Sequence, residues 1–310
     1  LIIAGQIWGD WRKYEKIIYD KDMKVMDFRV KRNLIFQILD EMNFQIDRAL
    51  DMYFSKKDVN SENKQDLFYR FMYDIFSILN YQKKNNITNS KLHRLIRSYS
   101  HEGLAKFVSN LIKKLKIYKK KYGYRDFIDQ LLHTIDFFNS NPDKIPGFKH
   151  VLVDEYQDVN DLQVELLNLI EPENLFVVGD PRQSIYGWRG SRISHIIDFQ
   201  KNYPGSSVLQ LTKNYRSNKN IVNLVNSVIK HMRLPDLKAN NGKTKKSITL
   251  LGHRHKNQEY NFVVQSILSM DCERSEIFVL ARTNNKLDEL EQYLRRAEIK
   301  YLKRTTERSK

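Results

Sequence analysis

The 310-residue chain has 41% hydrophobic and 29% charged residues, a composition that excludes an intrinsically disordered protein and fits about two folded domains. Lys and Arg number 53 against 37 Asp and Glu, which gives a formal net charge of +16. This excess favours a polyanionic partner, nucleic acid before an acidic membrane surface. A general compositional bias toward Lys, Asn, Ile and Tyr explains the same excess, so charge alone leaves both interpretations open.

Cysteine occurs once, at Cys272, which excludes an internal disulfide and a thiolate-cluster metal site. This usage indicates a reducing, intracellular setting, and we expect a cytoplasmic protein. No apolar run approaches the roughly 18–20 residues that a membrane span needs, so no membrane partner is expected. Because the chain begins with Leu1 rather than Met, we expect it to be an internal piece of a longer protein.

The first 121 residues are predicted to form an all-helical domain. Residues 1–141 contain no proline and residues 10–102 contain no glycine, so the usual helix breakers are absent from 10–102. Apolar residues recur there at spacings of three and four, which places them on one face of a helix. Two such faces are formed by Leu34, Ile35, Ile38, Leu39 and Met42, and by Leu67, Phe68, Phe71, Met72, Ile75, Phe76 and Leu79. We interpret both faces as core.

A run of lysines follows on a predicted helix between residues 106 and 125. It comprises Lys113, Lys114, Lys116, Lys119, Lys120 and Lys121, and no acidic residue lies between Glu102 and Asp126. The run is either a solvated helix face or a surface that contacts nucleic-acid phosphates, and the sequence leaves both open.

After Pro142 and Pro146 the pattern changes to alternating strands and helices, which predicts an α/β fold with buried parallel strands. We predict strands at Val151–Val153, Leu175–Val178, Val208–Leu211, Ser247–Leu251, Glu276–Ala281 and Ile299–Leu302. We predict helices at Asp126–Leu132, Asp161–Ile170 and Ser191–Asn202, one after residue 217 that Ser217 caps, and others around Asn261–Leu268 and Leu287–Leu294.

The strand predicted at residues 151–153 ends in two acids, Asp154 and Glu155. Mg²⁺ prefers carboxylate oxygens and water, so Asp154 is a candidate metal ligand. Glu155 is a candidate for orienting and activating a water molecule. A polar strand end at the protein surface gives the same pattern.

The strand predicted at residues 175–178 runs into a second polar loop, with Gln183 and then Tyr186, Trp188 and Arg189 between glycines. Gln183 suits a hydrogen bond to a phosphate oxygen or to water without added charge. The two rings suit stacking on unpaired bases, and the polar residues around them argue against core packing.

Tyr215 and Arg216 are predicted to follow a third strand and to precede a helix. A guanidinium there stabilises charge on a γ-phosphate, and the ring stacks on a purine. Surface side chains that extend their polar ends into solvent give the same dipeptide.

These three stretches resemble motifs II, III and IV of superfamily 1 DNA helicases of the UvrD/Rep/PcrA group. Residues 154–158 read DEYQD, residues 179–190 read GDPRQSIYGWRG and residues 214–217 read NYRS. The Asp126-Phe127 pair and residues 279–284 also resemble this family. The resemblance is firm from about residue 124 to residue 301, and only architectural before that.

The resemblance implies an α/β fold with RecA-like parallel-sheet motor domains (the P-loop NTPase fold), preceded by an all-helical subdomain. It divides the chain into a helical subdomain at 1–121, the second part of the first motor domain at 122–212, and the start of the second motor domain at 213–310.

The resemblance also implies an ATP-dependent 3′-to-5′ DNA helicase with the cofactors ATP and Mg²⁺, acting in DNA repair or replication. Asp154 then binds Mg²⁺, Glu155 activates water, Gln183 and Arg216 contact the γ-phosphate, and Tyr215 stacks on adenine. The implied partner is single-stranded DNA and its junctions with duplex DNA, which Tyr186, Trp188 and Arg189 contact.

The chain departs from the family in lacking a phosphate-binding loop of the form G-x-x-x-x-G-K-[ST]. The Gly-Lys-Thr at residues 242–244 lacks the first glycine and follows the third motif, so we interpret it as a basic loop. We therefore expect this piece alone to have little or no ATPase activity, with the phosphate loop supplied by a missing segment or a partner chain. Two alternatives stay open: the helicase part of a RecB/AddA-like helicase-nuclease, and a non-catalytic DNA-binding remnant.

Overall fold

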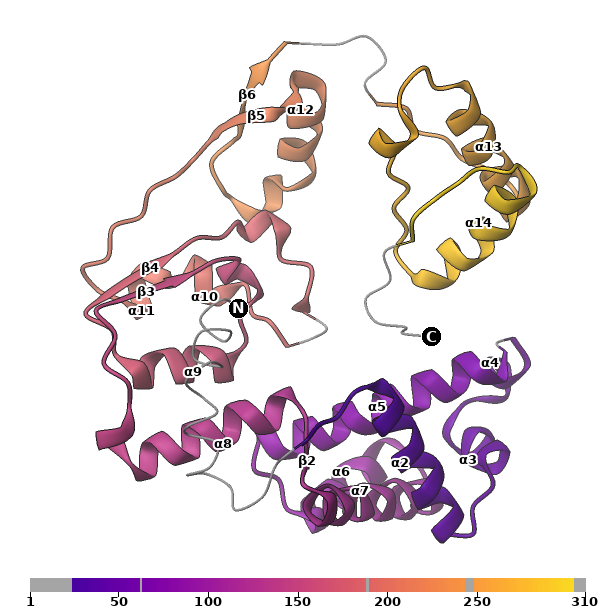
Figure 1. Ribbon diagram of the computed structural model, residues 1–310, viewed down its shortest axis with the longest axis vertical. Coiled ribbons are helices and arrows are strands. Elements are labelled where there is room, and N and C mark those ends of the chain that lie inside the picture. The colour runs from indigo at the N-terminus through magenta and orange to yellow at the C-terminus, as the bar shows by residue number, and fades with distance from the viewer. Residues whose placement is uncertain (1–23, 62, 188–189, 243–247, 304–310) are drawn as a thin grey trace. The chain divides into compact units, whose positions relative to one another are not determined.

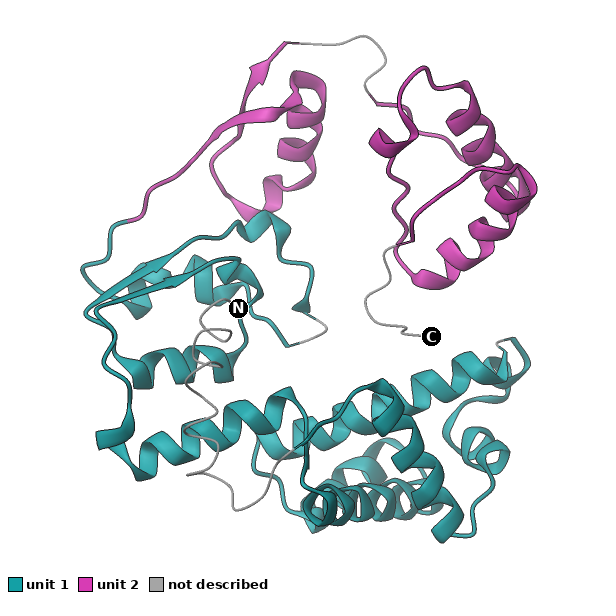
Figure 2. Cartoon of the chain, in the orientation of Figure 1, with its two compact units in different colours: residues 1–207 teal, residues 208–310 magenta. Residues whose placement is uncertain are grey.

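The computed structural model describes residues 24–61, 63–187, 190–242 and 248–303. The chain divides into two compact units, Leu1–Ser207 and Val208–Lys310 (Figure 2).

The first part of unit 1 is helical, as predicted (Figure 1). The short strand β1 (Lys24–Val25) precedes α2 (Phe28–Glu41), α3 (Ile46–Tyr53), α4 (Lys56–Ser61), α5 (Lys64–Lys84), α6 (Asn89–Tyr99) and α7 (Glu102–Tyr122). Side-chain caps begin several helices; for example, Asn63 accepts a hydrogen bond from the Asp66 N–H. The α7 helix ends at Gly123, whose φ of 66° suits glycine.

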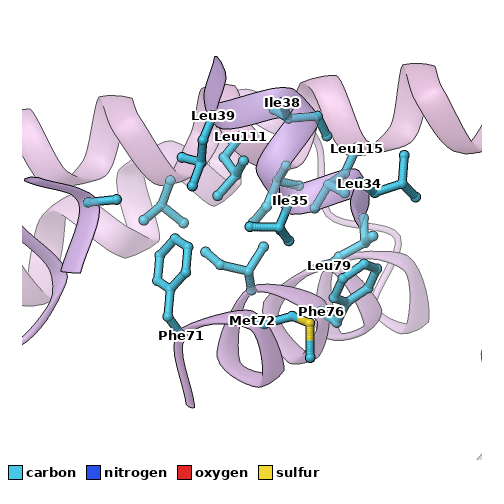
Figure 3. Packing of buried hydrophobic residues seen from close by; sticks show 14 of the residues in the cluster. Leu34, Ile35, Ile38, Leu39, Phe71, Met72, Phe76, Leu79, Leu111 and Leu115 are labelled. Atoms are coloured by element: carbon cyan, nitrogen blue, oxygen red, sulfur yellow. The ribbon is translucent and has the colours of Figure 1, made fainter. Parts of the chain in front are cut away.

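The apolar faces of α2, α5 and α7 form the main hydrophobic core. Figure 3 shows side chains from these helices pointing toward one another, with Ile35, Phe71 and Leu111 among those that are fully buried. Burying one such side chain stabilises the fold by roughly 1.5–3 kcal/mol. Both faces that the sequence assigned to a core belong to this cluster, which confirms that interpretation.

A small parallel sheet lies in the second part of unit 1. Strands β3 (His150–Val153) and β4 (Asn174–Val177) pair with Val151 opposite Leu175 and Val153 opposite Val177. The helix α9 (Asp161–Ile170) follows the predicted bounds, and its Leu167 and Ile170 pack with the buried Val151. On the other face, Leu152 and Phe176 are 64% and 57% exposed.

Unit 2 contains a second parallel pair and a helical pair. Strand β5 (Lys213–Asn218) pairs with β6 (Lys238–Asn241), and α12 (Lys219–Val228) follows β5 directly. The helices α13 (Lys256–Ser269) and α14 (Asn284–Arg296) share an apolar cluster that includes Val264 and Leu290.

Four of the predicted strands are wrong. In the described part of the chain, the runs at 208–211, 248–251, 276–281 and 299–302 form no strand. A strand requires hydrogen bonds to a neighbouring strand, whereas an apolar run only predicts burial, and several of these side chains are almost fully exposed, including Leu209, Leu211 and Leu250.

Two smaller predictions are also wrong. The helix predicted at Ser191–Asn202 is two short helices, α10 (Ser194–Ile197) and α11 (Phe199–Asn202). The helix after residue 217 is capped by Asn218 and not by Ser217, because the Asn218 side chain accepts the N–H groups of Asn220 and Ile221.

The helix α8 (Phe127–Ser140) joins the helical part to the sheet. Asp126 and Asp129 form a capping box at its start, in which each carboxylate accepts the backbone N–H of the other residue. The preceding strand β2 (Tyr124–Arg125) pairs with β1. The helix α8 then packs beside α9.

The same two aspartates form a buried ion cluster with lysines of α5 and α7. Lys83 Nζ lies 2.5 Å from Asp129 Oδ1 and 3.3 Å from Asp126 Oδ2. Lys119 Nζ lies 2.7 Å from Asp126 Oδ2 and also contacts Asp129. We call these four residues the ion cluster. Burial alone raises the pKa of Asp126, but the charges of Lys83 and Lys119 outweigh it and hold that pKa below its ordinary value.

The lysine run at residues 113–121 does not form one continuous surface, because one of its lysines belongs to the ion cluster. Lys119 is buried and paired with carboxylates, so it is not available to nucleic-acid phosphates. Lys114 pairs with Glu41 at 3.2 Å. Lys113, Lys120 and Lys121 are exposed, and phosphate contact remains a prediction for them.

Replacing Lys119 by Met is expected to lower the free energy of unfolding by roughly 3–5 kcal/mol, because it leaves buried carboxylates without one of their countercharges. The matched control is Lys120→Met on the exposed side of α7, expected within about 0.5 kcal/mol of wild type. Urea unfolding followed by circular dichroism measures both. Equal stabilities of the two variants would contradict a stabilising role for the ion cluster.

The pKa of Asp126 also predicts a pH dependence. A carboxyl whose pKa is lower in the folded state stabilises the fold above its unfolded pKa, and this contribution is lost as the pH falls. Lys83 of α5 and Lys119 of α7 face Asp126 from the packed helices, and Asp129 faces it from α8 itself. The stability difference between wild type and Asp126→Asn should therefore shrink as the pH falls below about 4. Thermal unfolding of both proteins from pH 7 to pH 3 measures this difference, and a pH-independent difference would refute it.

Candidate active site

The carboxyl end of β3 carries the two predicted acids. Asp154 and Glu155 are both exposed, and Asp154 Oδ1 accepts the Glu155 N–H at 2.9 Å. Glu155 adopts the left-handed conformation with φ 52° and ψ 42°. Non-glycine residues in this region cost roughly 1–3 kcal/mol and occur often at functional sites. The short helix η2 (Tyr156–Asp158) begins directly after it.

Side chains of η2 fix this turn to the sheet. Tyr156 is buried and meets the ring of Phe199 edge to face, with the ring centroids 5.5 Å apart. Burial raises the pKa of Tyr156 above its ordinary range. Burial, together with the charge of Glu155, also raises the pKa of Asp158. The Tyr156 N–H donates to Val178 O at 2.9 Å, so the two segments remain hydrogen-bonded beyond the ends of β3 and β4.

The end of β4 leads into the second motif. The helix η3 (Pro181–Gln183) is capped by Asp180, whose Oδ1 accepts the Arg182 N–H at 3.0 Å. Gln183 is exposed, and its Nε2 donates to Asp180 Oδ2 at 3.1 Å. The Asp180 N–H in turn donates to the Gln157 side chain at 3.0 Å. Gln157 donates to Glu155 Oε2 at 2.7 Å, so Glu155 and Gln183 belong to one hydrogen-bonded network.

The loop that follows carries the predicted base-stacking rings. Tyr186 is partly buried, and Trp188 and Arg189 lie outside the described residues. Ser191, just after the loop, forms an isolated bridge with Asn160.

Asp161 on α9 holds the chain that follows this loop, a role that the sequence did not indicate. Its carboxylate lies 3.3 Å from Arg192 Nε, 3.0 Å from His195 Nε2 and 3.1 Å from Lys84 Nζ of α5. Burial raises the pKa of Asp161, but hydrogen bonds from Lys84 and His195 and the nearby cations outweigh it and lower that pKa. An acid in the first turn of a helix usually serves the helix dipole, so sequence alone gave no signal for this contact.

Tyr215 and Arg216 lie in unit 2, inside β5 rather than after a strand as predicted. Both side chains are exposed. Their backbone is fixed because Asn214 Oδ1 accepts the Arg216 N–H at 3.1 Å and Asn241 Nδ2 donates to Tyr215 O at 2.8 Å. The Lys213 ammonium lies 4.9 Å from the centre of the Tyr215 ring.

The donor set at β3 fits a magnesium ion of the kind that binds phosphates. In phosphate-binding sites, Mg²⁺ keeps several waters and takes one or two protein carboxylates together with phosphate oxygens. The exposed Asp154 can provide such a carboxylate. The described residues include no group of three or more His, Cys, Asp or Glu side chains that could hold a metal without such a phosphate. The helices of the described residues include none long and apolar enough to cross a membrane.

Curated relatives match the chain over part of its length. The ATP-dependent DNA helicase PcrA of Leuconostoc citreum is 39% identical over 189 residues, which cover 57% of this chain and 25% of the relative. PcrA of Staphylococcus epidermidis is 38% identical over 189 residues (57% and 26%), and a probable DNA helicase II homolog of Mycoplasma capricolum is 33% identical over 187 residues (57% and 26%). The matched region thus spans about a quarter of the length of these relatives. These matches do not favour the helicase-nuclease or remnant alternatives and lend no support to a partner chain.

Two family models together cover almost the whole chain. The model of the UvrD/REP helicase N-terminal domain matches residues 11–204, and that of the UvrD-like helicase C-terminal domain matches residues 209–308. These domains have the RecA-like P-loop fold, and the helix-rich structure with small parallel sheets agrees with it. The chain therefore belongs to the UvrD/REP helicase family.

Proposed function

We propose that the natural protein containing this chain is an ATP-dependent DNA helicase that moves 3′ to 5′ along single-stranded DNA and unwinds the duplex ahead, in DNA repair or replication. The observation that carries this proposal is the hydrogen-bonded network joining Glu155 to Gln183 at the ends of two paired parallel strands. Ligands of open parallel sheets bind at the carboxyl ends of the strands.

The proposed domain division follows the resemblance. Residues 1–121 form the helical subdomain, residues 122–212 belong to the first motor domain and residues 213–310 begin the second. The gap between the two family matches, at 204–209, and the border of the compact units, at 207–208, both fall close to the second of these boundaries and support it.

In hydrolysis, the exposed Glu155 carboxylate orients a water molecule and accepts its proton as the water oxygen bonds to the γ-phosphorus of ATP. The bond between that phosphorus and the β–γ bridging oxygen breaks, which releases ADP and phosphate. Asp154 would hold Mg²⁺, and the bound ion would supply positive charge that offsets the charge on the phosphate oxygens. Gln183 reaches the γ-phosphate by its amide, which the Asp180 carboxylate orients.

Two residues of β5 are assigned nucleotide contacts from the resemblance to the helicase family. The Arg216 guanidinium stabilises the charge that develops on the γ-phosphate, and the exposed Tyr215 ring stacks on the adenine. Because none of the 310 residues forms a G-x-x-x-x-G-K-[ST] loop, the phosphate cradle of the natural protein comes from other residues. The 310-residue chain by itself is therefore expected to hydrolyse little ATP.

We assign the DNA contact to the loop after η3, where Tyr186, Trp188 and Arg189 contact single-stranded DNA and its junctions with duplex. Aromatic rings stack on any base, so this contact does not depend on sequence. The Asp161 contacts to Arg192 and His195 fix the chain just beyond the loop.

Replacing Glu155 by Gln in the natural protein is expected to lower DNA-stimulated ATP hydrolysis by roughly 100-fold or more, because the amide cannot accept the proton. Binding of ATP should persist, because Asp154 and Gln183 are unchanged. Steady-state phosphate release with and without single-stranded DNA measures the rate, and Glu165→Gln on the exposed side of α9 is the matched control. Stimulated hydrolysis that survives Glu155→Gln would overturn the assignment.

Replacing Trp188 by Ala in the natural protein is expected to weaken binding of single-stranded DNA by about 1–3 kcal/mol, which is the usual contribution of one stacked base. The loss should be equal for oligonucleotides of different sequence. Fluorescence anisotropy with thymidine-only and mixed-sequence oligonucleotides measures it, and Tyr99→Ala, which removes an exposed ring of α6, is the control. Unchanged affinity would place Trp188 in the core.

A further inference from the structure

Gln157 is buried beneath the proposed active site, with 1% of its surface exposed. Both ends of its amide are used: Nε2 donates to Glu155 Oε2 at 2.7 Å, and Oε1 accepts the Asp180 N–H at 3.0 Å. Burial of an amide is costly unless its polar atoms are bonded, so these two bonds fix the side chain in one orientation.

We propose that Gln157 is a positioning residue for hydrolysis, which holds the Glu155 carboxylate in register with the loop that carries Gln183. This inference rests on the proposed function, because it assigns Glu155 to the attacking water.

Glu155 needs such support because its backbone is strained and its side chain is exposed. Glu155 has a left-handed backbone conformation and follows the end of β3, and an exposed glutamate has several rotamers of similar energy. A charge-assisted hydrogen bond from a buried amide selects one of these rotamers. Holding the Glu155 carboxylate in one rotamer places it correctly for the attacking water, which raises the rate of hydrolysis.

The other end of Gln157 reaches the second strand end. Its Oε1 accepts the N–H of Asp180, and the carboxylate of Asp180 accepts from Gln183 Nε2 at 3.1 Å. A further bond runs from Ser184 Oγ to the main-chain oxygen of Gln157 at 3.3 Å. The turn after β3 and the loop after β4 are thus joined by one buried side chain.

Gly179 makes room for this bridge. A Cβ atom added at residue 179 would lie 2.6 Å from Gln157 Oε1 and 3.1 Å from the Tyr156 nitrogen. It would also lie 2.7 Å from Ile196 Cδ1. The backbone atom cannot yield cheaply, so any side chain at residue 179 displaces the Gln157 amide. Gly179 and Asp180 of the second motif therefore fit Gln157 of the first motif: Gly179 leaves space for its amide, and the Asp180 N–H donates to it.

The test compares three variants of the natural protein. Gln157→Met removes both bonds at similar volume, whereas Gln157→Glu keeps an acceptor for the Asp180 N–H but places a negative charge beside Glu155. The matched control is Gln82→Met, which removes another glutamine that is 1% exposed, in α5. We expect both Gln157 variants to lose roughly 10- to 100-fold in kcat with little change in KM for ATP, and Gln82→Met to keep wild-type kcat.

The outcomes separate a positioning role from a structural one. If Gln157 only stabilises the fold, both variants should reach wild-type kcat once the rate is expressed per folded molecule, with the folded fraction measured by circular dichroism; this result overturns the proposal. Wild-type kcat in Gln157→Met also overturns it.

Two further measurements separate this proposal from the proposed function. Loss of activity in Glu155→Gln together with normal Gln157 variants refutes only the positioning role. In the 310-residue chain, the side-chain NH₂ resonance of Gln157 should shift in Glu155→Ala and not in Glu165→Ala. An unshifted resonance excludes the bridge even if the natural protein hydrolyses no ATP.

Discussion

The parallel pairing of β3 with β4 is the constraint on which the proposed active site depends. Because Val153 lies opposite Val177, both strands end at the same edge, and the residues that follow them must meet there. Asp154 and Glu155 follow one strand, and the Gly179-Asp180 turn follows the other. Two polar loops more than twenty residues apart in sequence therefore share hydrogen bonds, with Gln157 between them.

Ion pairs connect the helical part of unit 1 to the two helices α8 and α9. The ion cluster joins α5 and α7 to the start of α8, and Lys84 reaches Asp161 on α9. Buried ions tolerate few geometries, because each loses its hydration and must keep its partner. The helical part is thus held to α8 and α9 in a defined orientation.

The sequence predicted what depends on local pattern. The apolar faces of the helices, the bounds of α9 and the polar ends of β3 and β4 follow from periodicity and spacing. It missed what depends on distant partners: Lys119 looked like a surface lysine because Asp126 and Asp129 are its neighbours only in the fold. The apolar runs in unit 2 looked like strands because an apolar pattern does not tell whether a partner strand is present to pair with. Gln157 stood within the first motif without an assigned role, because its two hydrogen-bond partners are known only from the fold.

The exposed face of the β3–β4 sheet affects how readily copies of the isolated chain associate in solution. Leu152 and Phe176 leave apolar surface on that face, and within the described residues each strand has one edge without a partner strand. Such edges promote association between copies. The net charge of +16 opposes that association by mutual repulsion, but salt screens repulsion beyond about 10 Å at 0.1 M. Dilute buffers therefore keep the isolated chain dispersed better than saline ones.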